Sequence, residues 1–388
     1  MSFSGFTRKS LANALIVAAA LCGGAATAIF GVCGPFSDVT DAGFCPFVLE
    51  VFYLGITTGT TPTTYDPASS VSRLQMAAFL SRSVDGVLKR GHRAAVNQFW
   101  TTQGGNSLGL TTISGAGCFD VRYDGADVWV SNGDNFNVSR VRASDGRLLE
   151  TWTGAASPNG LLVAMGRVFI AGGTSPGNLY QIIPSQPAGA VTAVTSLGNQ
   201  PVGIAFDGSR IWTANIGTSV SIVTPGTTIP WDATSVSAGF SQPFGILYDG
   251  TNIWITDYNF GTLLKLNSAG AILQTVTVGA HPRFPVFDGG NIWVPNAMDS
   301  SVSVVRASTG AVLATLTGNG LNNPFAAAFD GQRILVTNQS GNSVSLWKAA
   351  DLTAIGTFPT GGPGTAPRGV CSDGTNFWIA LLDKLARF

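Results

Sequence analysis

The sequence contains few charged side chains. Its 388 residues include 21 Lys and Arg against 21 Asp and Glu, so the formal net charge at pH 7 is zero and charged residues make up 11%. Soluble domains typically contain about 25% charged residues. A neutral chain has no global field to attract nucleic acid or an anionic membrane. With 49 Gly and a polar surface built largely from Ser, Thr and Asn, the composition favours strands joined by tight turns over a helical cytosolic enzyme.

Histidine and glutamate are too few to build a metal-and-base catalytic site. The chain has His92, His281, Glu50 and Glu150, and no other residue of either type. A catalytic metal with a general base needs several such side chains in one place. We therefore expect no catalytic residues of this kind, no metal and no cofactor.

Cysteine is scarce as well, and none of the five cysteines forms a CxxC or CxxCH motif. This excludes zinc ribbons, thioredoxin-like redox sites and c-type haem attachment. In an exported protein, Cys33 and Cys45 are expected to form a local disulfide. For Cys118 and Cys371 two alternatives stay open, a second disulfide or two buried thiols that pack as small apolar residues.

Long apolar runs are missing except at the N-terminus. Arg8 and Lys9 precede "LANALIVAAALCGGAATA", which ends in small residues. The pattern predicts a secretory signal peptide at residues 1–28, cleaved after Ala28. An uncleaved anchor is the alternative, because the apolar stretch carries no charge. No later run approaches the ~20 residues of a membrane span. After cleavage we expect no membrane segment and a secreted, cell-surface or periplasmic location at the cell envelope.

What the sequence does contain is a repeat of roughly 42 residues. Aromatic or apolar anchors recur every 39 to 43 residues, at Trp129, Phe169, Trp212, Trp254, Trp293, Leu335 and Trp378. Eleven residues before the anchors stand, in order, Cys118, Pro158, Pro201, Pro243, Pro282, Pro324 and Pro367. An Asp-Gly pair lies between them in six units, at Asp124, Asp207, Asp249, Asp288, Asp330 and Asp373. The second unit, "LLVAMGRVFIAGG", has a shortened turn there.

Each unit reads as four strands, with the anchor in the second ("RIWTAN") and an alternating third ("SVSVVRA"). Four strands per period of this length are typical of a β-propeller blade, whose apolar faces are covered by its neighbours in a ring. The seventh unit ends after three strands, and "LTTISGAGC" at Leu110–Cys118 matches the missing fourth. The prediction is an all-β, seven-bladed propeller at residues 108–388, with an N-terminal strand closing the last blade.

The unit "ILVTNQSGNSVSLWKAADLTAIGTFPTG" resembles the YVTN repeat, found in NHL-like and streptogramin-lyase-like propellers. The resemblance covers about residues 108–388. It implies a propeller architecture and no particular activity, because such propellers carry divergent ligands.

Residues 29–90 have a different character and resemble a surface-layer homology (SLH) module. The matches include "FSDV" at Phe36, "GITTG" at Gly55, an aromatic-x-Pro sequence at Tyr65, and a second helix that starts near Arg73. Residues 91–107 are predicted to be a linker. The resemblance implies a small helical module preceding the propeller.

SLH modules hold proteins to cell-wall polysaccharide, and the Arg of their Thr-Arg motif binds the anionic sugar. Arg73 is the matching residue, and the resemblance implies a cell-wall polysaccharide partner. A guanidinium suits carboxylate or ketal recognition. The chain departs from the pattern, with Ser72 in place of Thr, Gln75 in place of an acid, and one module where three usually assemble. The alternative is a packed cap with Arg73 at a helix N-terminus.

One face of the ring is predicted to gather a binding rim, formed by the residue after each Pro and the loop after each second strand. The set comprises Phe119, Asn159, Phe244, Asp257, Tyr258, Asn259, His281, Arg283, Phe325 and Arg368. Aromatic rings and guanidinium groups can hold a sugar, a peptide or an anionic ligand. The neutral ring lacks a basic track for single-stranded nucleic acid, so we expect no nucleic-acid partner. Packing within the ring is the alternative explanation for the phenylalanines.

Asp257 stands where four other blades have Asn. The five side chains in this slot are expected to close Asx turns on the backbone: Asn132, Asn215, Asp257, Asn296 and Asn338. That structural role competes with a role for Asp257 in ligand binding.

Together these features predict an exported, non-enzymatic propeller held at the cell wall by its SLH-like segment. Its rim would bind a small ligand or a protein partner. The alternative is a propeller lyase or lactone hydrolase acting at the channel mouth.

Overall fold

The computed structural model describes residues 33, 36–41, 44–53, 57–61, 63–81 and 110–388. The predicted signal peptide and linker lie outside them. The chain divides into two compact units, Met1–Arg93 and Ala94–Phe388. Among the described residues, no helix has the length and apolar character needed to cross a membrane.

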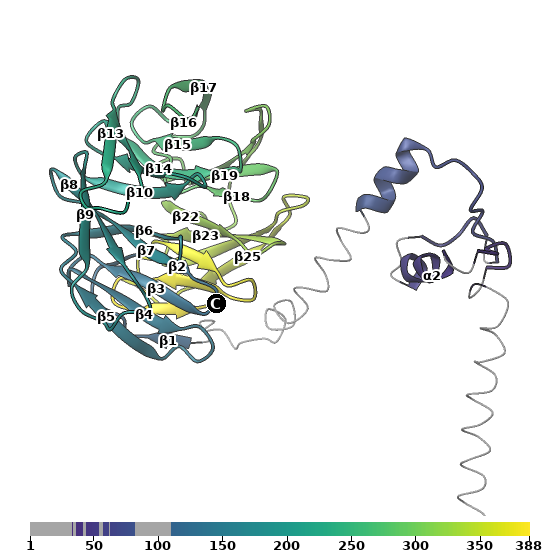
Figure 1. Cartoon of the computed structure of the whole chain (residues 1–388), viewed down its shortest axis with the longest axis horizontal. Helices are drawn as coiled ribbons and strands as arrows, with labels where there is room; N and C mark the ends of the chain where they lie inside the picture. The colour runs from purple at the N-terminus through teal and green to yellow at the C-terminus, as the bar shows by residue number, and fades with distance from the viewer. Residues whose placement is uncertain (1–32, 34–35, 42–43, 54–56, 62, 82–109) are drawn as a thin grey trace, which may run out of the picture. The chain divides into compact units, whose positions relative to one another are not determined.

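The described part of the second unit contains seven antiparallel sheets of four strands (Figure 1). The first blade consists of β2 (Cys118–Tyr123), β3 (Asp127–Asn132), β4 (Asn137–Arg142) and β5 (Leu148–Thr153). The second consists of β6 (Pro158–Ala164), β7 (Arg167–Gly172), β8 (Gly177–Ile182) and β9 (Thr192–Leu197). The third consists of β10 (Pro201–Phe206), β11 (Ile211–Asn215), β12 (Ser219–Thr224) and β13 (Asp232–Val236).

The remaining blades follow the same plan. The fourth consists of β14 (Pro243–Tyr248), β15 (Ile253–Asp257), β16 (Thr262–Leu266) and β17 (Ile272–Thr277). The fifth consists of β18 (Val286–Phe287), β19 (Asn291–Asn296), β20 (Ser301–Arg306) and β21 (Val312–Leu316). The sixth consists of β22 (Pro324–Phe329), β23 (Arg333–Asn338), β24 (Ser343–Lys348) and β25 (Ala354–Pro359). The seventh consists of β26 (Val370–Ser372), β27 (Phe377–Ala380), β28 (Leu385–Arg387) and β1 (Leu110–Thr112).

The first strands of the blades are innermost. In chain order each contacts the first strand of the next blade, and β26 of the last blade contacts β2 of the first. The sheets therefore form a ring, and the prediction of an all-β, seven-bladed propeller is confirmed.

The seventh blade draws on both ends of the ring segment. Its strand order is β1-β28-β27-β26, and Leu110 lies opposite Arg387 while Thr112 lies opposite Leu385. Figure 1 shows β1 in the same part of the ring as the C-terminus. The strand is shorter than the matched sequence, because it ends at Thr112.

The anchor residues are buried between blades. All have 0% exposure, and each belongs to a core cluster shared with the following blade: Trp129, Phe169, Trp212, Trp254, Trp293, Leu335 and Trp378. A buried Trp contributes about 150–250 Å² of contact area. This burial explains why the anchor recurs once per blade.

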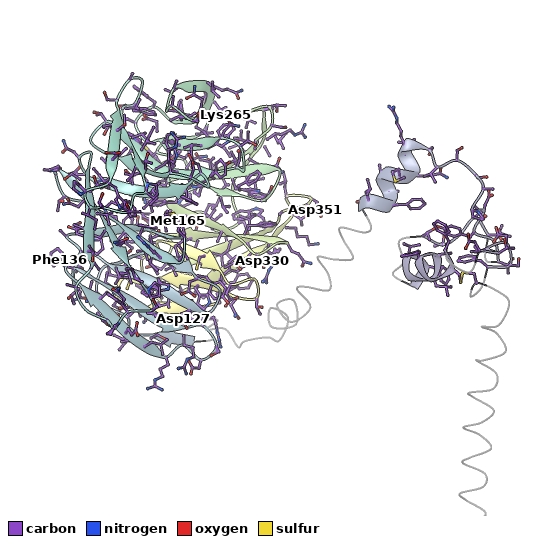
Figure 2. The ribbon with its side chains drawn as sticks, viewed as in Figure 1. Asp127, Phe136, Met165, Lys265, Asp330 and Asp351 are labelled. Carbon is purple, nitrogen blue, oxygen red and sulfur yellow. A yellow bond between two sulfur atoms is a disulfide. The ribbon has the colours of Figure 1, made fainter. Side chains whose placement is uncertain are left out.

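The Asp of the Asp-Gly turn is the partner of the buried indole. Five Trp Nε1 atoms donate to the turn carboxylate at 2.7 Å: Trp129 to Asp124, Trp212 to Asp207, Trp254 to Asp249, Trp293 to Asp288, and Trp378 to Asp373. The sixth blade has Leu335 as its anchor, and Asp330 (labelled in Figure 2) instead pairs with Arg333 at 2.6 Å. The second blade has Phe169 as its anchor and no Asp in the turn, where Met165 precedes Gly166.

Cys118 and Cys371 are free thiols. Of the two alternatives left by the sequence, the structure has the unpaired one. Cys118 is buried beside Asn132 at the start of the first blade, where the other blades have Pro. Burial raises the pKa of both thiols.

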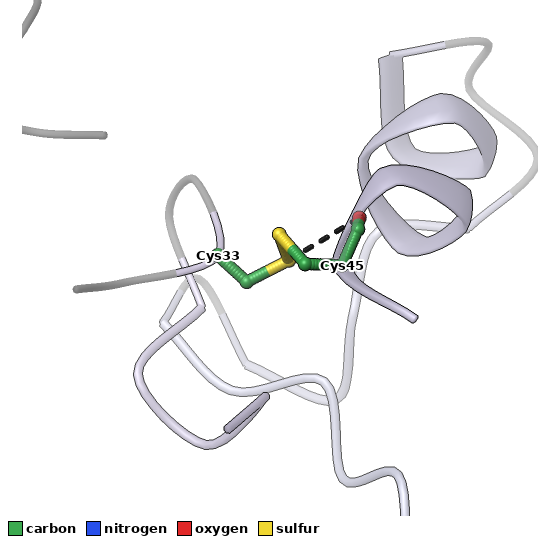
Figure 3. Close-up of a disulfide and its surroundings, with 2 residues drawn as sticks. All are labelled: Cys33 and Cys45. Atoms are coloured by element: carbon green, nitrogen blue, oxygen red, sulfur yellow. Dashed lines mark hydrogen bonds between the residues drawn. A yellow bond between two sulfur atoms is a disulfide. The ribbon is translucent and has the colours of Figure 1, made fainter. Parts of the chain in front are cut away.

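The described part of the first unit is built around Phe36. Cys33, Phe36, Val39 and Val48 are buried together. Cys33 and Cys45 form a disulfide with a Cα–Cα distance of 5.5 Å (Figure 3), which links Cys33 to the first residue of α2 (Cys45–Tyr53).

Asp38 ties a later turn to this cluster. Its carboxylate accepts hydrogen bonds from the backbone N–H groups of Tyr65 and Asp66 at 2.8 and 2.6 Å. The bond from Tyr65 is the main cause that lowers the pKa of Asp38.

Residues 73–81 are helical, and a capping box precedes them. The backbone N–H of Gln75 donates to Ser72 Oγ at 3.2 Å, and Gln75 Oε1 accepts from the Ser72 N–H at 2.8 Å. Ser72 and Gln75, the two departures from the SLH pattern, are thus the residues that start this helix. Arg73 is exposed in its first turn.

Candidate functional site

The strand register brings the predicted rim positions to one face of the ring. Pro243 lies opposite Asp257, and Pro324 lies opposite Asn338, so the start of each first strand adjoins the end of the second. The Asp-Gly turns lie at the other ends of these strands. The loop after each second strand therefore borders the residues that follow Pro.

The Asn side chains at the ends of the second strands do not close Asx turns, so that prediction is wrong. Their Nδ2 groups donate to Ser hydroxyls on the third strand at 2.7–3.1 Å: Asn132 to Ser139, Asn215 to Ser219 and Ser221, Asn296 to Ser301 and Ser303, and Asn338 to Ser343 and Ser345. These bonds satisfy the amide N–H groups inside the blade, whereas the Oδ1 atoms of Asn296 and Asn338 are buried without a partner among the described residues. The same bonds also explain the Ser-x-Ser pattern of the third strands.

The innermost strands approach one another closely. A Cβ added to Gly160 would lie 2.2 Å from the carbonyl oxygen of Val202, and one at Gly245 would lie 2.3 Å from that of Arg283. Glycine is required at these positions because no side chain fits between the strands. The side chain of the preceding residue then projects at the rim.

Hydroxyl groups hold several rim residues in place across the blade boundary. Thr256 Oγ1 donates to the carbonyl oxygen of Arg283 at 2.8 Å, and Thr337 Oγ1 donates to that of Arg368 at 2.7 Å. In each pair the hydroxyl comes from the preceding blade. The rim backbone is therefore positioned by the blades rather than by free loops.

Four phenylalanines meet at this face. Ring centroids lie 5.2 Å apart for Phe244 and Phe284, 5.4 Å for Phe284 and Phe325, 5.7 Å for Phe119 and Phe325, and 5.9 Å for Phe119 and Phe284. The rings come from the first, fourth, fifth and sixth blades. Phe325 is buried, whereas the other three are half-buried. We call these four residues the Phe cluster.

Two guanidinium groups lie over the Phe cluster. Arg283 lies 4.9 Å from the ring centroid of Phe325, and Arg368 lies 6.0 Å from that of Phe119. Arg283 Nη1 also donates to Gln339 Oε1 at 2.8 Å. Burial is the main cause that lowers the pKa of Arg283, Tyr258 acts to raise it, and the positive charge of Arg368 adds a smaller lowering. The two guanidinium groups lie over neighbouring rings, because Phe325 and Phe119 are 5.7 Å apart.

Tyr258 and His281 extend the aromatic surface on one side. Their rings stack at 4.1 Å with an interplanar angle of 14°, and Tyr258 stacks in turn on Phe244 at 5.6 Å. His281 has a positive φ of 56°, but the residue before Pro has this conformation in most blades, for example Gln200 at 54°. This backbone geometry therefore belongs to the repeat and is no sign of strain specific to His281.

The structure brings seven of the ten predicted rim residues together, but not Asp257, Asn159 or Asn259. The Asp257 side chain is buried, and its carboxylate accepts the backbone N–H groups of Ser241, Gln242 and Phe260. Asp257 therefore has the structural role that the sequence offered as the alternative to ligand binding, because its carboxylate fixes the backbone of the neighbouring loops. Asn159 donates to the carbonyl oxygen of Pro201 at 3.0 Å, and Asn259 donates to Ser241 Oγ at 3.3 Å.

Sequence reasoning missed Phe284 and Gln339. Phe284 occupies the slot that holds Gly160, Gly203 and Gly245 in other blades, and an aromatic residue in a glycine slot was the available signal. Pro285 ends normal pairing there, so β18 has two residues. The Phe284 N–H instead donates to the Phe325 carbonyl oxygen at 3.2 Å, which draws the ring into the cluster.

Within the described ranges, no three His, Cys, Asp or Glu side chains are grouped so that they could hold a metal. His281, the histidine of the ring, faces Tyr258 and has Arg283 two residues away in sequence. Glu150 lies on β5, the outer strand of the first blade, and pairs with Arg140 at 3.4 Å.

No protein-family model and no curated protein matches the chain. Solved structures do. A streptogramin B lyase is 17% identical with a TM-score of 0.61, over 72% of this chain and 94% of that one. The virginiamycin B lyase of Staphylococcus aureus is 17% identical with a TM-score of 0.61, over 70% and 94%. The WD40 propeller domain of Doa1 is 13% identical with a TM-score of 0.61, over 72% and 95%.

The chain has the β-propeller fold. At these identities the similarity shows the fold alone, since propellers with the same architecture serve unrelated functions. The site must therefore be judged from its own side chains.

Proposed function

We propose that this protein is an exported, non-enzymatic binding protein whose propeller rim receives a ligand or a protein partner. The observation that carries the proposal is the half-buried group of aromatic rings and two guanidinium groups at the inner ends of the blades. Concave or central sites with apolar walls and a few polar groups are the usual ligand sites of proteins. The rim residues are also positioned by hydrogen bonds between blades, as a preformed site requires.

Exposed apolar side chains on the same face support a large partner. The loops between second and third strands carry Phe136 (labelled in Figure 2), Phe260, Met298 and Leu382, which are 56%, 61%, 70% and 40% exposed. These loops come from four blades and border the rim. Exposed apolar groups gathered on one face are typical of interaction surfaces.

The first unit is proposed to anchor the protein to cell-wall polysaccharide. Arg73 supports this, because it is exposed in the first turn of a helix. A cation at that position is unfavourable for the helix dipole, so helix stability does not account for it. A guanidinium there is available to an anionic sugar. Export by a signal peptide at residues 1–28 and a cell-envelope location belong to the same proposal.

The rival function is a lyase or lactone hydrolase that acts at the same rim. It draws on the fold shared with the streptogramin B lyase, whose activity belongs to that protein. The rim offers His281, but the two carboxylates next to it hold backbone N–H groups, Asp257 those of Ser241 and Gln242 and Asp299 that of Ala280. The side chains therefore favour binding over catalysis.

The test uses the chain without residues 1–28, immobilised and exposed to cell-wall and culture-medium fractions. We expect a retained compound or protein that the rim variant Phe244→Ser loses and that Met165→Ala keeps, because Met165 lies in an Asp-Gly slot on the opposite face. If both variants retain the compound or protein equally, the rim is not its binding site. Chemical conversion of a retained compound would favour the enzyme instead.

A further inference from the structure

The arginines at the rim differ from the paired arginines of the ring. The ion pairs among the described residues join five arginines to Asp or Glu: Arg122, Arg140, Arg142, Arg210 and Arg333. Arg283 and Arg368 form no such pair within the same residues. Arg283 donates a hydrogen bond to Gln339 and also lies against Tyr258, at 5.9 Å from its ring centroid, whereas Arg368 Nε has no hydrogen-bond partner among the described residues.

The Nε atoms of Arg283 and Arg368 are both buried without a hydrogen-bond partner among the described residues. A buried donor left without an acceptor destabilises the protein, and more so when it is charged. The two guanidinium groups over the Phe cluster therefore each have a hydrogen-bond donor that lacks an acceptor among the described residues.

The aromatic floor only partly offsets this cost. The guanidinium groups lie over Phe325 and Phe119, whose rings contact each other at 5.7 Å. Cation–π contacts stabilise the positive charge but supply no hydrogen-bond acceptor. Both Nε atoms therefore still lack a partner among the described residues. An anion bound at this place would supply the missing acceptor.

We propose that the rim binds a carboxylate held by Arg283 and Arg368, with the apolar part of the ligand packed on the Phe cluster. This rests on the proposed binding function of the rim and specifies the chemistry of its ligand. A carboxylate is planar and matches the guanidinium fork. The neighbouring floor is made of phenyl rings, which suit an apolar or aromatic group better than the strongly hydrated shell of a phosphate dianion.

Isothermal titration of the chain lacking residues 1–28 can test this with three probes: benzoate, its neutral analogue benzamide, and inorganic phosphate. We expect benzoate to bind at least about tenfold more tightly than benzamide or phosphate, because a charge-assisted hydrogen bond contributes about 1.5–3 kcal/mol. Added salt should weaken benzoate binding and leave benzamide unaffected.

Variants assign the effect to the two side chains. Arg368→Gln and Arg283→Gln should each weaken benzoate binding about tenfold or more, whereas Arg368→Lys should retain part of it. Arg306→Gln is the matched control, since Arg306 is exposed at the end of β20 on the opposite face. Arg368→Gln is the decisive variant should Arg283→Gln fail to fold.

Three outcomes would each overturn the inference. Benzoate and benzamide could bind equally, phosphate could bind more tightly than benzoate, or Arg368→Gln could leave the benzoate affinity unchanged. If the rim captures another compound but does not bind benzoate, the proposal of a carboxylate ligand is wrong, and the proposed binding function of the rim still stands.

Discussion

Trp254 Nε1 donates a 2.7 Å hydrogen bond to Asp249 Oδ2, five positions earlier in the sequence. The other oxygen of the same carboxylate accepts the backbone N–H groups of Thr251 and Asn252. The Asp249 side chain thus closes the turn between β14 and β15 and also accepts the hydrogen bond of the indole that packs between this blade and the next. The repeated Asp-Gly and Trp therefore form one structural unit.

Replacing Asp249 by Ala should destabilise the ring by about 2 kcal/mol or more. The variant loses an acceptor for a buried indole N–H and for two turn amides. Chemical denaturation followed by Trp fluorescence measures the change. Asp232→Ala at the exposed start of β13 is the control and should stay within about 0.5 kcal/mol of wild type. Equal destabilisation by the two variants would contradict the role of Asp249.

Stability should depend on the ionisation of Asp207. Burial acts to raise its pKa, but hydrogen bonds from Trp212, Arg210 and Ser209 outweigh burial and lower the pKa from 3.8 to about 2. A folded-state pKa below the unfolded value gives stability that is present above about pH 4 and is lost as the pH falls toward 2.

The comparison of wild type with Asp207→Asn isolates this effect. The variant should be less stable by about 1 kcal/mol at pH 6, and the difference should shrink as the pH approaches 2. Unfolding free energies measured at several pH values give the answer. A difference that stays constant from pH 6 to pH 2 would rule out the titration of Asp207 as its source.

The pairing of β1 with β28 predicts different results for two deletions. Removing residues 1–116 exposes the backbone edge of β28 and should lower the melting temperature of the whole ring. Removing residues 1–93 keeps Leu110–Thr112 and should leave melting nearly unchanged. Calorimetry of both proteins tests this, and identical melting would mean that β1 contributes nothing to ring stability.

Binding to cell-wall sacculi should depend on Arg73. In co-sedimentation, Arg73→Ala should lose most of the bound fraction, and Arg73→Lys should keep less than wild type because it lacks the guanidinium fork. Ser72→Ala is the control, since it removes the capping hydroxyl but keeps Arg73. If Ser72→Ala and Arg73→Ala reduce binding equally, helix integrity rather than sugar recognition explains the result.

The repeat could be recognised from the sequence because every blade needs the same residue types at the same positions. The repeating Pro, as at Pro243 or Pro324, starts an innermost strand, and the anchor, as at Trp254, covers the next blade. Such requirements recur at fixed spacing and need no knowledge of the other blades. The count of seven blades, the four strands in each and the convergence of Phe244 and Arg283 on one face followed from that periodicity.

Other features depend on contacts between residues that the repeat places in different strands or blades. Phe284 joins the rim because Pro285 diverts its strand toward Phe325, a local exception that a periodic pattern hides. Asn338 bonds to Ser343 and Ser345 rather than to its own loop, because the neighbouring strand offers hydroxyls inside the blade.

The nearness of Arg283 and Arg368 is likewise a product of the ring. The two residues belong to the fifth and seventh blades, and the sequence could assign each to the same rim but not to the same place on it. Only the closed ring brings Phe325 and Phe119, over which the two guanidinium groups lie, into contact with each other. Periodicity determined the architecture of this protein, whereas packing between blades decided the chemistry of its rim, because long-range contacts leave no fixed spacing in the sequence.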